Sequence, residues 1–114
     1  STATRAEAGE VLVGVAGSGG VATGRARVIL DPGALDDFDP GDVLIAPQTD
    51  PSWAPLFITA SAVVVNVGAL GSHAMIVSRE LGIPCVVSVA DATVRIADGA
   101  MVTVDGNNGT VTVL

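Results

Sequence analysis

The sequence has 114 residues, which fits one domain with a single core rather than two. Hydrophobic residues make up 49% of it but aromatic residues only 3%, so the core must be aliphatic. Five arginines, no lysine and twelve acidic residues give a net charge of −7. So few cations cannot neutralise a row of phosphates, which argues against nucleic-acid and anionic-membrane partners.

Cysteine usage and hydropathy indicate the compartment. Cys85 is the only cysteine, so no internal disulfide can form and a reducing cytoplasm is expected. No apolar stretch reaches the roughly 18–20 residues needed to span a bilayer. The N-terminus also lacks a basic region followed by an apolar run, which argues against a secretion signal.

Short strands separated by turns dominate the predicted elements. Residues 1–10 are small and polar and are expected to form a flexible lead-in to a domain spanning 11–114. β-Branched valine occurs 19 times and favours strands. The pattern predicts a mostly buried strand at 11–15, a turn at 17–20, and an acidic loop at 31–42. Further strands are predicted at 25–30, 43–46, 62–67, 85–89, 94–96, 101–105 and 110–114.

Two helices are predicted between these strands. Asp50 before Pro51 is a plausible helix start, with the carboxylate as cap and proline at the first position, so a short helix is expected over 51–60. The second helix runs from His73 to Leu81 and ends at Gly82, where a left-handed cap is expected. The result is an α/β domain with more strand than helix and mixed strand directions.

His73 is the strongest candidate for chemistry. It follows an apolar strand and a glycine-containing turn and opens a helix, where unpaired N–H groups and the helix dipole can hold a phosphoryl group. The same field disfavours the imidazolium form and keeps the ring nucleophilic. The helix turns Ala74, Val77, Ser78 and Leu81 toward the core and leaves His73 at the edge of that stripe.

The segment Gly68-Ala69-Leu70-Gly71-Ser72-His73-Ala74-Met75-Ile76-Val77-Ser78-Arg79-Glu80-Leu81-Gly82-Ile83-Pro84 resembles the signature of the mobile, or swivelling, domain of phosphoenolpyruvate-utilising enzymes. That family includes phosphoenolpyruvate synthase, pyruvate phosphate dikinase, enzyme I of the sugar phosphotransferase system and rifampicin phosphotransferase. Residues 14–28, the segment Thr49-Asp50-Pro51-Ser52-Trp53 and the closing strands from Asp98 onward are also similar. About 100 residues are covered in family order.

The resemblance implies a swivelling β/β/α fold with small mixed sheets and two or three short helices. It implies that His73 is transiently phosphorylated, supported by Gly68, Gly71, Ser72 and Arg79, in a phosphotransferase (kinase) component that is inactive without its partner domains. Those partners would be an ATP-grasp nucleotide-binding domain and a domain for phosphoenolpyruvate, pyruvate or another acceptor, in cis or as separate subunits. ATP or phosphoenolpyruvate and Mg²⁺ would bind there, and no cofactor is expected in this chain.

The chain departs from the family pattern near His73. Ala69 replaces the second of two paired glycines, Asn66 replaces an acidic or polar residue, and Gly71 replaces a threonine that a regulatory kinase modifies in some relatives. The alternative is therefore a degenerate domain, not phosphorylated, that serves as an interaction or regulatory module. Phosphate on His73 after incubation with donor and partner domains would distinguish the two.

Roles for several other residues remain open. Ser72 could cap the helix, the simpler expectation, or bind phosphoryl oxygens. Arg79 points about 120° away from His73 on an ideal helix, which favours a structural partner, Asp or Glu, over phosphate. Cys85 and Trp53 are expected in the core.

Two further site types are disfavoured. Residues 17–22 match a dinucleotide fingerprint, but a strand is predicted where the fingerprint needs a helix. A metal site is also disfavoured, because the sequence has no second histidine and its aspartates do not have the spacing of metal ligands. The final acceptor is not encoded in a carrier, and the chain could be a free subunit, a C-terminal carrier domain or a fragment.

Overall fold

The computed structural model describes residues 3–33, 38–69 and 71–114. Residues 1–2 of the expected lead-in, 34–37 of the acidic loop and Leu70 lie outside the described residues. The elements follow in the order β1 (Val11–Val13), β2 (Val15–Ser18), β3 (Val21–Val28), β4 (Val43–Ala46), the 3-10 helix η2 (Pro51–Trp53), α1 (Ala54–Thr59), β5 (Ala62–Val65), α2 (His73–Leu81), β6 (Cys85–Val87), α3 (Ala92–Arg95), β7 (Met101–Asp105) and β8 (Thr110–Val113).

The described strands form one sheet in the order β1-β8-β7-β3-β4-β5-β6-β2. The long strand β3 belongs to both halves: it pairs antiparallel with β7 and parallel with β4. From β3 to β6 the pairing is parallel, whereas β1, β8, β7 and β3 pair antiparallel. The sheet is therefore mixed, as expected, and it folds over so that its two ends are the consecutive strands β1 and β2.

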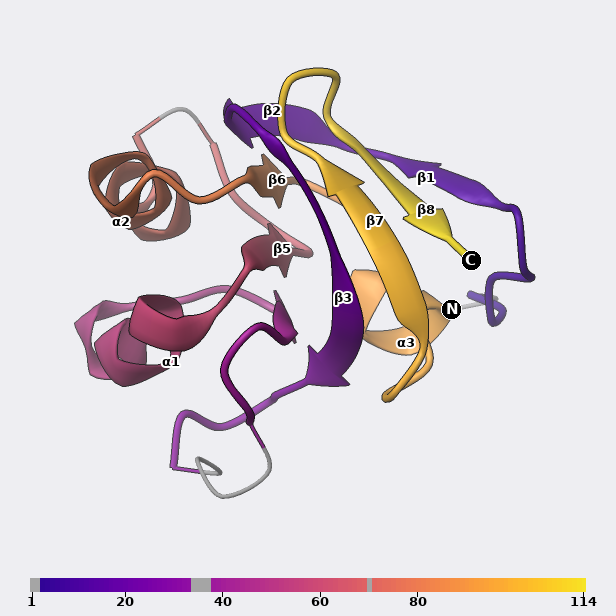
Figure 1. The fold of residues 1–114 in the computed structure, drawn as a ribbon, viewed down its shortest axis with the longest axis horizontal. Helices are drawn as coiled ribbons and strands as arrows, with labels where there is room; N and C mark the ends of the chain where they lie inside the picture. The colour runs from indigo at the N-terminus through magenta and orange to yellow at the C-terminus, as the bar shows by residue number, and fades with distance from the viewer. Residues whose placement is uncertain (1–2, 34–37, 70) are drawn as a thin grey trace.

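The chain is arranged in three layers, two of sheet and one of helix (Figure 1). One hydrophobic cluster lies between the halves of the sheet and includes Val64, Val86, Val104 and Val111. A second lies between the parallel strands and the helices α1 and α2. Consecutive residues of β4, Val43 and Leu44, belong to opposite clusters because successive side chains of a strand point to opposite faces. The β/β/α architecture expected from the resemblance is confirmed.

The N-terminal strand differs from the expectation in two ways. It divides at Gly14 into β1 and β2, and an added Cβ at Gly14 would lie 2.5 Å from the Val87 carbonyl oxygen. The valines predicted to be buried are exposed, with 71% of Val13 accessible, while Leu12 is buried. Leu12 faces inward because it pairs with the buried Val111. Alternation alone does not say which face is inside.

Other boundaries also shift. The strand predicted from residue 25 begins at Val21, so the turn is confined to Gly19 and Gly20. Strand β5 ends at Val65 and β6 at Val87, each two residues early. The strand predicted at 94–96 is wrong, because the short helix α3 occupies 92–95. The last two strands are confirmed within one residue.

Both predicted helices are confirmed. The first is η2 followed by α1, and the Asp50 carboxylate caps it by accepting from the Ser52 N–H at 2.9 Å. The second, α2, spans His73–Leu81, and Gly82 has the expected left-handed conformation with φ of +73°. Of its predicted apolar stripe, Ala74 and Ser78 are buried but Leu81 is 46% exposed, and Met75 takes its place in the core.

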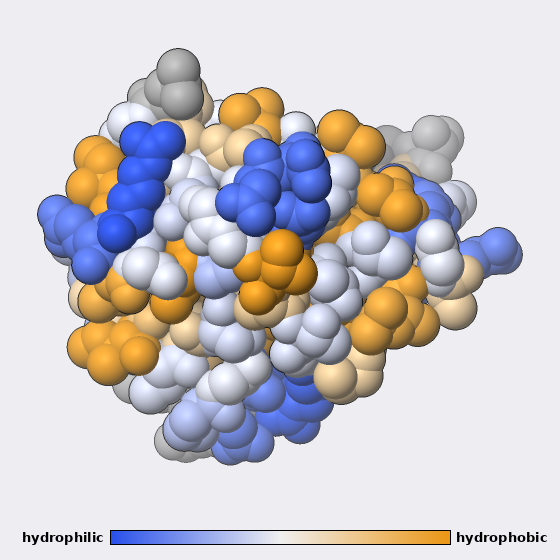
Figure 2. Space-filling view, turned by 45° about the horizontal axis from the view of Figure 1, so that its top comes forward, coloured by the Kyte–Doolittle hydropathy of each residue, from blue (hydrophilic) through white to orange (hydrophobic). Residues whose placement is uncertain are grey.

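The described part of the lead-in, residues 3–10, makes defined contacts. The Ala6 N–H donates to the Arg95 carbonyl at 2.8 Å, and Arg95 forms an ion pair with Glu10. Across the described residues, every helix falls short of the length and hydropathy needed to cross a bilayer. On the face shown in Figure 2, apolar side chains are interspersed with polar ones.

Candidate functional site

The start of α2 brings His73 to one side of the helical layer. The chain leaves β5 at Val65 and enters α2 at His73. Helix α2 packs against β2, β5 and β6 and lies beside α1 (Figure 1). Ala74, Met75 and Ser78 provide its buried face. His73 itself is partly buried, because it lies at the edge of that face.

Two neighbours fix the His73 ring. The Thr49 hydroxyl oxygen lies 2.9 Å from Nδ1, within hydrogen-bond distance. Phe57 of α1 meets the ring edge-to-face, with 5.6 Å between ring centroids and an interplanar angle of 86°. With Nδ1 engaged by Thr49, Nε2 is the nitrogen left for chemistry. In the neutral ring with a proton on Nδ1, the Thr49 oxygen accepts and Nε2 carries the free lone pair.

Ser72 precedes the helix without capping it through its side chain. Its backbone is extended, and its carbonyl accepts the first intrahelical bond, from Ile76 N–H at 3.0 Å. The N–H groups of residues 73–75 therefore precede the first intrahelical bond and have no acceptor within the helix. The Ser72 hydroxyl makes no capping bond, so that expectation is wrong. It is buried with no hydrogen-bond partner among the described residues.

Gly71 and Gly68 are glycines for different structural reasons. Gly71 has φ of +84°, a left-handed conformation that L side chains rarely adopt, although an added Cβ would meet no described atom within 4 Å outside its chain neighbours. At Gly68 an added Cβ would lie 3.0 Å from Val87 Cβ and 3.4 Å from the Ser72 hydroxyl oxygen. Ala69 is exposed, and its carbonyl accepts from Ser72 N–H at 3.0 Å.

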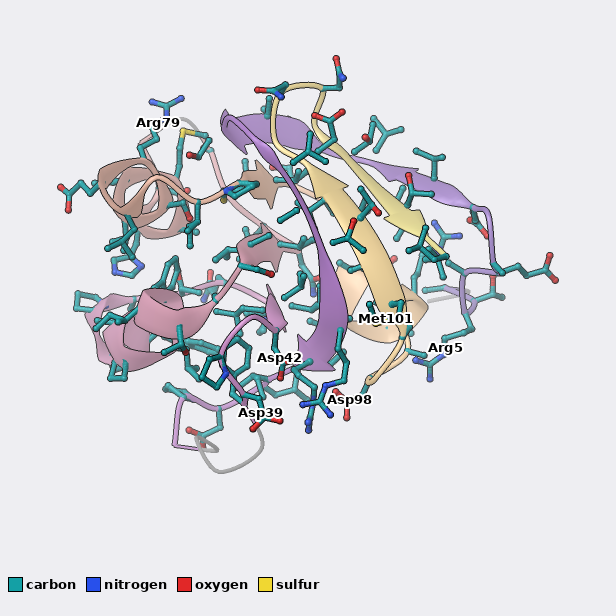
Figure 3. All side chains as sticks on the ribbon, in the orientation of Figure 1. Arg5, Asp39, Asp42, Arg79, Asp98 and Met101 are labelled. Atoms are coloured by element: carbon teal, nitrogen blue, oxygen red, sulfur yellow. The ribbon has the colours of Figure 1, made fainter. Side chains whose placement is uncertain are left out.

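Arg79 does not extend toward His73. Its Nε donates to the Gly17 carbonyl oxygen at 2.7 Å, which ties α2 to β2. The partner is a backbone carbonyl rather than the carboxylate expected from the sequence. Figure 3 shows the Arg79 side chain projecting outward from α2.

Asn66 has a structural role that the sequence did not reveal. Its amide nitrogen donates to the Thr93 hydroxyl at 2.8 Å, and its amide oxygen accepts from Thr93 N–H at 3.0 Å. The side chain thus joins the end of β5 to the first turn of α3. This contact accounts for asparagine at position 66, so the residue no longer supports a degenerate site.

Sequence reasoning missed Thr49 and Phe57 as members of the site. Thr49 was noticed only within the family-like segment, and no local pattern connects it with a histidine 24 residues later. Next to it, the hydroxyl and N–H of Ser52 hold the pKa of the Asp50 carboxyl below its usual value. A negative charge is therefore held near the ring.

The remaining candidates lie outside the site. Burial raises the pKa of the Cys85 thiol to about 11, as expected for a core cysteine. Trp53 is buried in the cluster under α1 and α2. Residues 17–20 lead into strand β3, where a dinucleotide site would need a helix. The described residues contain no cluster of three or more potential metal-binding side chains.

Comparisons with known proteins agree with this geometry. A family model described as "PEP-utilising enzyme, mobile domain" matches residues 38–109. The chain is 51% identical over 105 residues to phosphoenolpyruvate synthase of Aeropyrum pernix, covering 90% of this chain and 13% of that protein. It is 46% identical over 103 residues to rifampicin phosphotransferase of Streptomyces sviceus, covering 90% of this chain and 12% of that protein.

Solved structures show the same fold. The solution structure of an Enzyme I protein superposes with a TM-score of 0.61 at 33% identity, covering 70% of this chain and 33% of that one. Aconitase X of Thermococcus kodakaraensis gives a TM-score of 0.70 at 22% identity, covering 93% and 99%, a likeness of fold alone. The chain spans 12–13% of the length of the two enzymes named above. By its sequence, its fold and the position of His73, the chain belongs to the mobile-domain family of phosphoenolpyruvate-utilising enzymes.

Proposed function

We propose that this domain is a phosphoryl carrier in which Nε2 of His73 accepts a phosphoryl group at one active site and releases it at another. The observation that carries the proposal is the fixed orientation of the His73 ring. The only histidine in the sequence opens a helix, with Thr49 on Nδ1 and no hydrogen bond from the described residues to Nε2. Membership of the mobile-domain family supports the same reading.

The transfer step balances with the groups present. The Nε2 lone pair attacks phosphorus, an N–P bond forms, and the P–O bond to the donor's leaving group breaks. The proton stays on Nδ1, so the ring becomes positively charged as the bond forms. The Thr49 oxygen accepts from Nδ1–H and gains strength as that charge develops, since hydrogen bonds from charged donors are stronger.

The start of α2 would stabilise the group once it is attached. The N–H groups of residues 73–75 and the positive end of the helix dipole favour a dianionic phosphoryl group. The Ser72 hydroxyl is buried and has no partner among the described residues, so in this proposal it donates to a phosphoryl oxygen. In this proposal Gly68 and Gly71 shape the turn around the group, whereas Arg79 supports the helix from its far side.

The donor and acceptor would belong to partner domains. An ATP-grasp domain and a domain for phosphoenolpyruvate, pyruvate or another acceptor would dock at His73 in turn, and Mg²⁺ would bind there with the nucleotide. Relatives named phosphoenolpyruvate synthase and rifampicin phosphotransferase match the same segment. The acceptor is therefore assigned to the partner rather than to this domain.

A chemical donor tests the accepting step without any partner. The chain is incubated with phosphoramidate, a small P–N phosphoryl donor, and its mass and 31P spectrum are followed. We expect one acid-labile, base-stable phosphate on Nε2 of His73. His73→Asn should take up none, and because the chain has one histidine the assignment needs no further separation.

A partner then tests the carrier step. Phosphoenolpyruvate synthase of Aeropyrum pernix lacking its own mobile domain is mixed with this chain and labelled ATP or phosphoenolpyruvate, with its own mobile domain in trans as positive control. Label should appear on His73 and leave when the acceptor is added. If the control is labelled while this folded chain is labelled neither by the enzyme nor by phosphoramidate, the domain is a degenerate, non-phosphorylated module.

A further inference from the structure

The turn after β6 contains a residue with an unusual backbone. Ser88 has φ of +56°, in the left-handed region that a non-glycine residue occupies only at a cost in free energy. Its neighbours impose this conformation. Val86 pairs with Val64 in the sheet, and the Val89 N–H donates to the Val65 carbonyl at 3.1 Å, so the chain stays beside β5 on both sides of Ser88.

The conformation directs the Ser88 side chain to the turn before α2. The Ser88 hydroxyl donates to the carbonyl oxygen of Gly68. Gly68 is confined on two further sides, because an added Cβ would come within 3.0 Å of Val87 and 3.4 Å of the Ser72 hydroxyl. The next carbonyl, that of Ala69, accepts from the Ser72 N–H at 3.0 Å, so a shift of Gly68 is expected to reach Ser72, the residue directly before His73.

Resting on the proposed function, we propose that Ser88 is a positioning residue for phosphoryl transfer. Its hydroxyl holds the Gly68 carbonyl and thereby fixes the turn that sets Ser72 and the first N–H groups of α2. Ser88 touches neither the imidazole nor the transferred group. Glycine would adopt the left-handed conformation at no steric cost, but it would provide no hydroxyl for Gly68.

Two substitutions separate positioning from stability. Ser88→Gly removes both the backbone strain and the hydroxyl, so the melting temperature should stay equal or rise while phosphoramidate labelling of His73 slows. Ser88→Ala removes only the hydroxyl and keeps the strain, so labelling should slow equally and the melting temperature should fall. We expect a loss of roughly tenfold in rate, below the hundredfold loss associated with a misplacement of about 1 Å.

Asp91→Gly is the matched control. Asp91 is the other described non-glycine residue with positive φ, +58°, and its side chain makes no capping bond to α3. Replacing it with glycine relieves similar strain three residues further along, away from Gly68. Its labelling rate should equal that of the unsubstituted chain.

Amide chemical shifts give a readout that needs no phosphorylation. Ser88→Gly should shift the amides of residues 68 and 71–75, and Asp91→Gly should leave them in place. Three results would each overturn the positioning role: labelling of Ser88→Gly at the unsubstituted rate, equal slowing by Ser88→Gly and Asp91→Gly, or unchanged amides in Ser88→Gly. Failure of the unsubstituted chain to take up phosphate overturns the proposed function instead, and the amide shifts still decide whether Ser88 holds the turn.

Discussion

Thr49→Val removes the hydroxyl from Nδ1 of His73 while keeping the branched shape of the side chain. A hydrogen bond of 2.9 Å to a neutral partner contributes about 1 kcal/mol, whereas one from a charged donor contributes about 1.5–3 kcal/mol. In the proposed step the reacting ring is the neutral form, and it becomes positive as the N–P bond forms. The transition state therefore loses about 0.5–2 kcal/mol more than the ground state, which corresponds to a rate reduction of roughly 2- to 30-fold.

Labelling by phosphoramidate measures this effect directly, because no partner domain needs to bind. Thr49→Ser keeps the hydroxyl and should label within a few-fold of the unsubstituted rate. Nitrogen NMR of the single histidine follows the same contact, and Thr49→Val should change the Nδ1 resonance. The melting temperature should fall by about 4 °C, as expected for a loss of about 1 kcal/mol in a domain of this size.

Two results would refute this reasoning. If Thr49→Val labels as fast as Thr49→Ser while both remain folded, the hydroxyl does not support the charged ring. If phosphate is found on Nδ1 instead of Nε2, the nitrogen held by Thr49 is the nucleophile, and the assignment of the two ring atoms is reversed.

Three further expectations concern groups elsewhere in the domain. Arg79→Ala loses the hydrogen bond to the Gly17 carbonyl, so it should lower the free energy of unfolding by about 1 kcal/mol in denaturant titrations. Its labelling rate should stay unchanged. Slower labelling with unchanged stability would instead assign Arg79 to phosphate binding. Cys85, whose pKa burial raises to about 11, should not react with a thiol reagent at pH 8 until the domain unfolds, and fast reaction of the folded chain would contradict its place in the core. Burial acts to raise the pKa of Asp42, but hydrogen bonds from Arg25 and a backbone N–H outweigh it and place the pKa below its ordinary value of 3.8. The stability from this group is present above that value and is lost as the pH falls through the lower, folded-state pKa, so Arg25→Gln should move acid unfolding, followed by circular dichroism, to higher pH. An acid transition that Arg25→Gln leaves in place would refute that role.

The structure shows why the acid-sensitive pair is outside the site. Asp42 is buried beside β3 and close to Asp39, and Figure 3 shows both near the end of that strand. Arg25 reaches both carboxylates, at 2.8 Å from Asp42 and 2.9 Å from Asp39. The ion pairs hold the loop after β3 against the sheet, so their loss is expected to affect stability rather than transfer.

Local patterns were reliable where a single element carries its own signals. Helix α2 could be predicted from His73 to Leu81 because glycine-containing turns bound it and apolar residues recur at helical spacing. They failed at α3, where Val94 and Ile96 suggested a strand. The buried residues there are Ala92 and Ile96, which are four positions apart, as on one face of a helix. The Asn66 amide oxygen accepts a hydrogen bond from the Thr93 N–H in the first turn of α3.

The family and the candidate histidine could be identified from the sequence by itself, because both depend on residues that are neighbours along the chain. The tertiary structure alone decided what holds that histidine. Thr49, Phe57 and the Ser88 contact with Gly68 come from separate segments, and the parallel strands β4, β5 and β6 bring the ends of those segments together. No local pattern encodes such contacts, because their partners are joined by the pairing of strands and not by spacing along the chain.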